Sequence, residues 1–561
     1  MQESCKMLPI FSHFFSFARI TQFVTLFIAI AFCTTFAYEG DCGTMKAFEN
    51  YIKRKKQPHY ALVKESEKKE TKCTPEVYYD SVYSIETAHI QVFYTMTGPH
   101  ATTKAFAKAT ATSMEEAWDF YINKHKMREP KGPSISLHFL QEVKNGLYPI
   151  EIVDLEQVRG HKIGDYIKNF GVTEPLDDFG FSQIFMENDF YYGSSKNENK
   201  DTIFVDGDTC LYAKSTIELR NIAHNFAYTD EWAKGIRLTS FHEFYHAVQL
   251  RYLDLSTPTF WFEASAAGFE EITNPDIDDY ISYIPKFFER TGQALSDSFR
   301  NYGASTLLLY LYNNVSKDID KSIWENFSKN PNNSFEDQLI ASIKPLKLDA
   351  DSIFHDYSVR LSFSGKRSKD LPKKSWIHND QSEWPEAKII VSDSINPNIR
   401  SLAFKFYNIP QNYASPYVVD FTNFTGKASV ALYKDGKASI YKIESNNTLN
   451  SMASVLSSSD SSVWIFSRFG ESESIPIVHS DVAPHAYPVP WKEGPLCFAP
   501  LPRGKKFIEI RTRRGDLISQ EKYEGTSFCL QEDQVKSMMA PGLFRFRVGN
   551  KGRTTSFIIA Y

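Results

Sequence analysis

The feature that most constrains the fold is a change of pattern near residue 365. Between Leu238 and about Ile343 the sequence carries almost wholly helical signals, whereas the chain beyond Gly365 has short runs rich in β-branched and aromatic residues, separated by Gly, Asn, Asp and Ser. At 561 residues the chain is also too long for one hydrophobic core. We therefore expect a multidomain protein, with an α+β domain first and β-sandwich domains after it.

The chain before the helical part alternates between strand and helix. The run AHIQVFYTMTG places Ile90, Val92 and Tyr94 on one face, as in a strand, and ends at a Gly-Pro stop. An Ala-rich helix is expected at about 102–124, and further strands at SISLHF and DTIFVDG. This alternation predicts mixed α and β structure ahead of the helices.

The first 37 residues predict a signal peptide. Lys6 and Arg19 precede an apolar run that extends from Phe23 to Phe32, and Ala37 stands at a suitable cleavage site. No later segment approaches ~18 uninterrupted apolar residues, the length that crosses a bilayer. We therefore expect a protein that is secreted to the exterior or the cell surface, with no transmembrane anchor. A formal net charge of −5 gives no reason to expect a nucleic-acid partner.

Residues 38–84 are polar and rich in charge, which predicts a small N-terminal cap or propeptide-like segment. The four basic residues at 53–56 are either a processing site or the solvated face of a helix, and we favour the helix face. Whether this segment inhibits the protein before maturation is left open by the sequence.

Removal of the signal peptide leaves five cysteines. In an oxidising compartment the two pairs that lie close in sequence, Cys42 with Cys73 and Cys497 with Cys529, are candidates for disulfides. Cys210 would then be left over, either as a free thiol or, as we favour, as a buried small residue.

The motif HEFYH at residues 242–246 is the strongest functional signal. Residues four apart share one face of a helix, so His242 and His246 can offer two imidazoles to a single ion, and Zn²⁺ suits them. Glu243 lies on a neighbouring face, from which it can take a proton from a metal-bound water. The alternative is a helix whose histidines are hydrogen-bonded in a core, with Ser240 and Glu243 forming a capping box. The alternative does not explain two histidines on one apolar helix, so we favour zinc.

A catalytic zinc site needs a third protein ligand and an open position. Glu263 lies 17 residues beyond His246, at the start of a second expected helix, and a helical hairpin would return it to the first helix. Glu270 and Glu271 are the alternative ligands. If they are not ligands, they either support the ligands or face solvent.

The sequence HEFYHAVQ followed by WFEASAAGFEE resembles the pattern of gluzincin peptidases. Together with TGPHA, DTIFVDGD and YGASTLLLYL, it is similar to a family of secreted bacterial metalloproteases best known from myxobacteria. The resemblance covers about residues 85–365 and implies a zincin-like metallopeptidase domain there. It also implies roles for the motif residues: zinc ligands at His242, His246 and Glu263, and a general base at Glu243.

Two further residues are interpreted through this resemblance. Tyr302, in RNYGAS, occupies a place that resembles the position of an oxyanion-binding tyrosine in aminopeptidase-like gluzincins, and the alternative is an aromatic residue packed in the core. Thermolysin-like members carry an aspartate four residues after the ligand glutamate, where this chain has Ala267, so the support of the histidines must come from elsewhere. No exopeptidase motif is evident, and we expect an endopeptidase.

The C-terminal segment at 486–561, with AYPVPW, LCFAPLP and PGLFRFRVGNKGRTTSFIIAY, resembles the Ig-like sorting domain of the type IX secretion system. This resemblance implies that the secretion machinery is a partner of the C-terminal domain. Residues 366–482 are expected to form a separate β-sandwich domain.

The expected function is that of a secreted zinc-dependent endopeptidase, which hydrolyses proteins through a zinc-activated water with Glu243 as general base. The alternative is a non-catalytic surface adhesin or polymer-binding protein, in which the zinc site is structural or vestigial. The presence of Glu243 argues against the alternative, because a structural site needs no base there.

Overall fold

The computed structural model describes much of the chain between residues 44 and 561. The described ranges are 44–51 in part, 81–98, 100–155, 169–188, 190, 200–205, 208–213, 230–253, 260–297, 302–391, 399–408, 426–443, 459–470, 485–499, 501, 506–523, 528–549 and 554–561. The expected signal peptide, the basic cluster at 53–56 and the Cys42 and Cys73 pair lie outside these ranges. Cys210 lies in a strand whose side chains are outside the description.

The first sheet has five strands in the order β1-β2-β3-β5-β4. The three central strands are parallel, and each of the two outer strands is antiparallel to its neighbour. Their bounds are β1 Val82–Glu86, β2 Ile90–Thr95, β3 Tyr148–Val153, β4 Gly171–Pro175 and β5 Ser182–Glu187. A separate hairpin pairs β6 Lys200–Val205 with β7 Asp208–Ala213, which confirms the strand expected at DTIFVDG.

The parallel pair β2 and β3 is joined by a helical crossover, as parallel strands require. Helix α4 spans Lys104–Trp118 and continues as the π-helix η3 Asp119–Lys124, which confirms the helix predicted at 102–124. Thr103 caps α4, because its side chain accepts a hydrogen bond from the Phe106 amide.

The prediction of a strand at SISLHF is wrong, because within residues 134–139 only Ile135 forms a bridge, with Glu142. The reason lies in the backbone hydrogen bonds of this segment. The amides of His138 and Phe139 donate to the buried carboxylate of Glu151, and the amide of Leu137 donates to Gln183 Oε1. Side chains therefore satisfy the amides that a strand ladder would have used.

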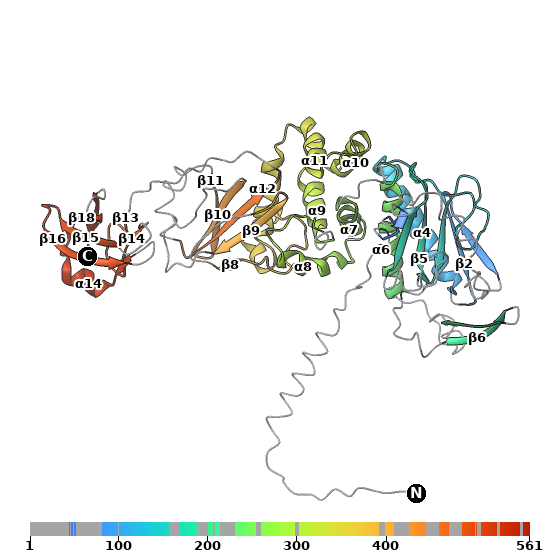
Figure 1. The fold of residues 1–561 in the computed structure, drawn as a ribbon, viewed down its shortest axis with the longest axis horizontal. Helices are drawn as coiled ribbons and strands as arrows, with labels where there is room; N and C mark the ends of the chain where they lie inside the picture. The colour runs from blue at the N-terminus through green and yellow to red at the C-terminus, as the bar shows by residue number, and fades with distance from the viewer. Residues whose placement is uncertain are drawn as a thin grey trace, which may run out of the picture.

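The helical part begins earlier than the sequence indicated, at Asp230 instead of Leu238. Helix α6 lies between the first sheet and the later helices and contacts α4, β4 and β5 on one side and α7 on the other (Figure 1). The α-helices are α6 Asp230–Gln249, α7 Trp261–Thr273, α8 Ile284–Glu289, α9 Ser305–Asn314, α10 Ile319–Lys329, α11 Phe335–Ile343 and α12 Ala350–Leu361. Short 3₁₀ helices are η6 Asp279–Tyr283, η8 Tyr302–Ala304, η9 Lys344–Leu346, η10 Gly365–Asp370 and η11 Lys373–Ser375.

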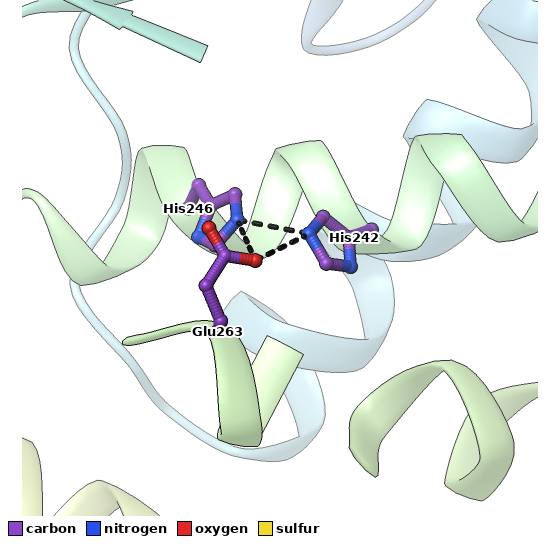
Figure 2. Close-up of side chains that lie close together, drawn as sticks. All are labelled: His242, His246 and Glu263. Carbon is purple, nitrogen blue, oxygen red and sulfur yellow. Dashed lines mark hydrogen bonds and ion pairs between the residues drawn. The ribbon is translucent and has the colours of Figure 1, made fainter. Parts of the chain in front are cut away.

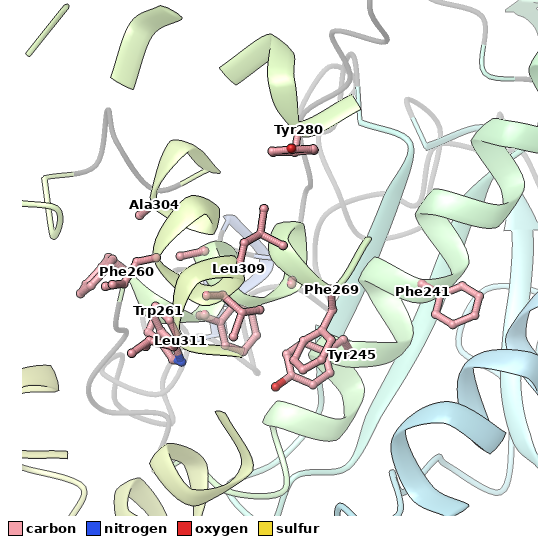
Figure 3. Close-up of a cluster of buried hydrophobic side chains, with 14 of the residues drawn as sticks. Phe241, Tyr245, Phe260, Trp261, Phe269, Tyr280, Ala304, Leu309 and Leu311 are labelled. Atoms are coloured by element: carbon pink, nitrogen blue, oxygen red, sulfur yellow. The ribbon is translucent and has the colours of Figure 1, made fainter. Parts of the chain in front are cut away.

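The core between these helices is dominated by aromatic rings. Figure 3 shows Tyr245 of α6 beside Phe269 of α7, whose ring centroids are 4.8 Å apart. Trp261, at the start of α7, is fully buried and packs against Phe335 of α11. Rigid aromatic contacts of this kind fix the position of α7 against α6.

The second sheet has the order β11-β10-β12-β9-β8. Its strands are β8 Ile390–Val391, β9 Ala403–Asn408, β10 Lys427–Lys434, β11 Lys437–Ile443 and β12 Ser461–Arg468. One face packs on α12, where buried His355 hydrogen-bonds Ser429 and Ser467, each at 2.7 Å. Among the described strands this region is therefore one sheet covered by a helix, where a sandwich was expected.

The C-terminal region contains two small sheets that share one core. The first joins β13 His485–Tyr487, β14 Leu496–Ala499 and β17 Phe528–Leu530, and the second joins β15 Lys506–Thr512, β16 Leu517–Tyr523, β18 Gly542–Val548 and β19 Thr554–Ile559. Helix α14 spans Glu532–Met538. Cys497 and Cys529 face each other on β14 and β17 and form a disulfide, which confirms this predicted pair.

The described residues therefore form mixed α and β structure around several hydrophobic cores. One core runs from the first sheet through the helices to the inner face of the second sheet, while the C-terminal sheets have a core of their own. None of the described helices is both long enough and apolar enough to cross a membrane.

Candidate metal centre

The HEFYH motif lies in the second half of α6, deep within a continuous helix. Ser240 is ten residues past the first residue of that helix, Asp230, so it cannot cap the helix. The capping-box explanation of Glu243 is therefore wrong. His242, Glu243 and His246 are all at most 5% exposed, and a buried carboxylate beside two buried imidazoles needs another physical reason.

Three of the predicted residues converge on one point (Figure 2). The Nε2 atoms of His242 and His246 are 2.9 Å apart, and Oε2 of Glu263 lies 3.4 Å from the first and 3.6 Å from the second. Donors around a tetrahedral zinc ion at ~2.0–2.1 Å are about 3.3 Å from one another. The three atoms therefore have the separations that one small tetrahedral ion would impose.

The orientation of His246 is set by Gln249, one turn along α6. The Gln249 amide nitrogen donates to the carbonyl of Phe262 and to Ser265 Oγ, both at 2.9 Å, which turns Oε1 toward His246 Nδ1 at 2.7 Å. Because that oxygen only accepts, Nδ1 of His246 must carry the proton. Nε2 is left with its lone pair directed at the centre. The Phe262 ring stacks on the imidazole, with centroids 4.1 Å apart.

The orientation of His242 is set by Glu270, which resolves the question raised by Ala267. Glu270 lies seven residues after Glu263 on α7, and its carboxylate accepts a hydrogen bond from Nδ1 of His242. A carboxylate paired with the outer nitrogen of a histidine is the usual support of a metal ligand. Glu270 is therefore a supporting residue of this centre, and Glu271, the other alternative ligand, lies in a different cluster.

These contacts leave three lone pairs facing one another. Both imidazoles donate through Nδ1, so neither Nε2 has a proton to share with the other nitrogen or with Glu263. Both carboxylate oxygens of Glu263 are buried and have no hydrogen-bond partner. Burial raises the pKa of the Glu263 carboxyl, and only positive charge beside it, such as protonated His246 and His242 would carry, lowers that pKa to well below its usual range. A divalent cation would satisfy all three donors at once, so the residues fit a metal ion.

Glu243 points toward the outer strand β4. Its Oε2 accepts hydrogen bonds from Thr173 Oγ1 of β4 at 2.7 Å and from Thr44 Oγ1 of the N-terminal segment at 2.8 Å. A Cβ at Gly171 would lie 2.4 Å from Cγ of Glu243, so only glycine leaves room for the carboxylate side chain. No local pattern indicates these three neighbours, because they come from segments far from the motif.

Residues 44–51, where described, are helical and lie against this part of the site. Besides binding Glu243, the Thr44 hydroxyl accepts a hydrogen bond from the backbone amide of Thr173 at 2.7 Å. Ala47 and Phe48 are buried, and the Phe48 ring contacts Phe262, the neighbour of ligand Glu263. The N-terminal segment therefore contacts both the predicted base and the strand beside it.

Tyr302 is placed next to the centre by η8. Its ring is nearly parallel to that of His242, with centroids 6.3 Å apart, and it also stacks on Tyr283 at 4.7 Å. Tyr302 is half-buried, unlike the fully buried rings of the helical core. The structure therefore brings the residue to the site, while the role of its hydroxyl stays a prediction.

Asp320 of α10 is a supporting residue that sequence reasoning missed. Its carboxylate accepts hydrogen bonds from Tyr245 of α6 and from Trp261 Nε1 of α7, the second at 2.7 Å. Burial raises the pKa of Asp320 to about 7, although its hydrogen bonds lower it. One buried carboxyl therefore ties together the two helices that carry the metal donors.

Comparison of the chain with known protein families and with curated proteins finds no match. What the centre can do is therefore inferred from its own donors and their geometry.

Proposed function

We propose that the chain is a secreted zinc-dependent metallopeptidase of zincin-like fold, which cleaves proteins internally. The observation that carries the proposal is the set of three mutually facing donors, His242, His246 and Glu263, with a buried glutamate beside them. A purely structural zinc site usually has four protein ligands, whereas three protein donors suit a catalytic site that keeps an open position. The helix that carries the motif packs on the five-stranded sheet, which is consistent with that fold class.

A bound zinc ion would lower the pKa of a water molecule and polarise the substrate carbonyl. Glu243 would take the proton of the attacking water and deliver it to the leaving amine, as a general base and then a general acid. The Thr173 hydroxyl donates a hydrogen bond to Oε2 of Glu243 and would hold the carboxylate in place. Tyr302 would donate a hydrogen bond to the developing oxyanion.

The outer strand β4 offers a way to bind an extended peptide. Within the described sheets β4 pairs only with β5, and the amide of Thr173 is bound by a side chain, Thr44, in place of a strand. An extended peptide that replaced Thr44 would gain a main-chain partner beside Glu243. This supports a protein or peptide as the substrate.

The C-terminal module supports the secreted part of the proposal. Its disulfide, Cys497–Cys529, is typical of proteins that mature in an oxidising compartment. The module has its own core and carries none of the metal donors, so it would serve delivery through the secretion machinery and take no part in hydrolysis.

The decisive experiment measures zinc content and protein hydrolysis of the purified chain, with and without a chelator, for the parent and for Glu243→Gln. We expect one zinc ion at this centre in both proteins, hydrolysis that the chelator abolishes, and a loss of ~10²–10⁴-fold in Glu243→Gln. The matched control is Glu289→Gln, at an exposed position of α8. Hydrolysis that Glu243→Gln leaves unchanged would exclude the mechanism. A zinc-loaded parent without hydrolysis would favour the adhesin alternative.

A further inference from the structure

A second group of donors lies at the other end of α7. Glu271 of that helix faces His378 and Asp380, which belong to the segment after η11. Nε2 of His378 is 3.7 Å from Oε1 of Glu271, and Nδ1 of His378 is 2.8 Å from Oδ2 of Asp380. One ligand atom from each residue lies within 4.8 Å of the others.

The environment of Glu271 is unfavourable for a carboxylate without a positively charged partner. Its side chain is 0% exposed, and neither oxygen has a hydrogen-bond partner. The charged groups that act most strongly on it are the acidic residues Asp380, Asp278 and Glu270. Burial, followed by these neighbours, raises the pKa of Glu271 to about 9. A protonated Glu271 could donate to Asp380, but its other buried oxygen would still have no hydrogen-bond partner, so proton uptake alone does not satisfy the group.

Neighbouring aromatic side chains hold His378 and Asp380 in place. Tyr280 donates to Asp380 Oδ2 at 3.4 Å and accepts a hydrogen bond from Trp384 Nε1 at 2.8 Å. The Tyr280 ring also meets His378 edge-on, with centroids 6.2 Å apart. Asp380 and His378 are largely buried, at 19% and 11% side-chain exposure. The segment around 376–384 therefore presents its donors to α7 from a fixed position.

We infer that Glu271, His378 and Asp380 form a second metal site, which takes a divalent transition-metal cation such as Zn²⁺ or Mn²⁺. One imidazole and two carboxylates suit such an ion, whereas Ca²⁺ prefers six to eight oxygen ligands. The ion would give both oxygens of Glu271 a positive partner and would offset the surrounding negative charge. It would also tie the segment at 376–384 to α7.

The second site is separate from the first and does not depend on the proposed peptidase activity. Glu263 and Glu271 are eight residues apart on α7, or about 12 Å along the helix axis at ~1.5 Å per residue. Paired-metal catalytic centres need ions about 3.5–4 Å apart. The second ion would therefore hold the structure together and take no part in a two-metal reaction.

The test counts bound ions in the full-length protein. The parent, Glu271→Gln, Asp380→Asn, Glu263→Gln and the exposed control Glu289→Gln are loaded with Zn²⁺, or separately with Mn²⁺, and passed through a metal-free column. Elemental analysis should give two ions per chain for the parent and the control, and one for each of the three other variants. The double variant Glu263→Gln with Glu271→Gln should hold none.

Thermal unfolding followed by circular dichroism gives a second measurement and checks that each variant folds. The midpoint of the parent should rise on metal addition by more than that of folded Glu271→Gln. The inference is overturned if parent and Glu271→Gln bind the same number of ions and respond equally to added metal. If Glu263→Gln loses an ion and Glu271→Gln does not, only the first centre binds metal. If Glu271→Gln loses an ion and Glu263→Gln does not, the second site is supported and the first centre does not bind metal.

Discussion

The two donor clusters share helix α7 but differ in how their charges are balanced. In the first, His242 and His246 are held by separate acceptors on their outer nitrogens, Glu270 and Gln249, and direct bare nitrogens at Glu263. In the second, His378 lies between two carboxylates, with one ring nitrogen toward each. The first cluster is pre-arranged for an ion by its supporting residues. The second depends on the ion itself to relieve the repulsion between its acids.

The two glutamates on α7 show this difference most directly. Burial tends to raise the pKa of both carboxyls. Positive charge on the imidazoles of His246 and His242 reverses the effect at Glu263, whereas Asp380 and Asp278 reinforce it at Glu271. The same residue type on one helix therefore takes opposite shifts, because the neighbours supplied by other elements differ in charge.

The largest expected effect is a loss of hydrolysis when a ligand of the first cluster is replaced. Glu263→Gln should lower hydrolysis at least ~10³-fold, because it would remove a ligand of the zinc ion in the proposed mechanism. Steady-state hydrolysis of a protein substrate measures the loss, with zinc content determined on the same sample. A Glu263→Gln protein that hydrolyses substrate at the parent rate would show that the first cluster is not the reaction centre.

A smaller effect is expected from the residue that supports His242. Glu270→Ala should weaken zinc binding at the first centre by about 10–100-fold, because the imidazole loses the acceptor that fixes its orientation. Competition with a chelating dye gives the affinity, and Glu289→Ala at an exposed position is the control. Equal affinities in Glu270→Ala and the control would show that Glu270 plays no part in holding the ligand.

Thr44 of the N-terminal segment contacts Glu243 beside the first cluster, and removal of the Thr44 hydroxyl should raise activity. Thr44→Val deletes the hydrogen bonds to Glu243 and to the Thr173 amide, so kcat/KM should increase by up to roughly tenfold. Thr112→Val, on the exposed face of α4, is the matched control. A fall in kcat/KM would mean that the Thr44 hydroxyl assists Glu243 instead of blocking access to it.

The smallest expected effect is a difference in pH dependence of the metal-free protein. Because the pKa of Glu271 is about 9 in the folded chain against 4.5 as its ordinary value, the folded chain binds more protons between these limits, and stability falls as pH rises through them. Thermal unfolding across pH 5–9 in the presence of a chelator should show a shallower decline for Glu271→Gln than for the parent. Identical profiles would contradict the assigned shift.

The sequence predicted the first cluster because its ligands follow simple spacings. His242 and His246 are separated by one helical turn, and Glu263 lies one short hairpin away. Glu243 was likewise identified from the motif, and Tyr302 from the resemblance to gluzincins. The structure adds where these two residues lie, while their catalytic roles stay predictions. The mixed architecture, the helix at 102–124 and the pair Cys497–Cys529 also followed from local patterns.

The remaining features depend on contacts that no local pattern encodes. Glu271 and His378 are 107 positions apart, and nothing in either neighbourhood indicates that they meet. Asp320 belongs to no motif, yet it is buried and hydrogen-bonds residues of both α6 and α7. The strand predicted at SISLHF failed for the same reason, because the distant side chains of Glu151 and Gln183 satisfy its amides.

The contact of Thr44 with Glu243 is made within one chain, 199 residues apart in sequence. Its strength is therefore governed by an effective local concentration that does not change when the protein is diluted. A peptide that binds at β4 must displace Thr44 against this fixed local concentration. The apparent affinity of the peptide would therefore be lowered by the same factor at every protein concentration.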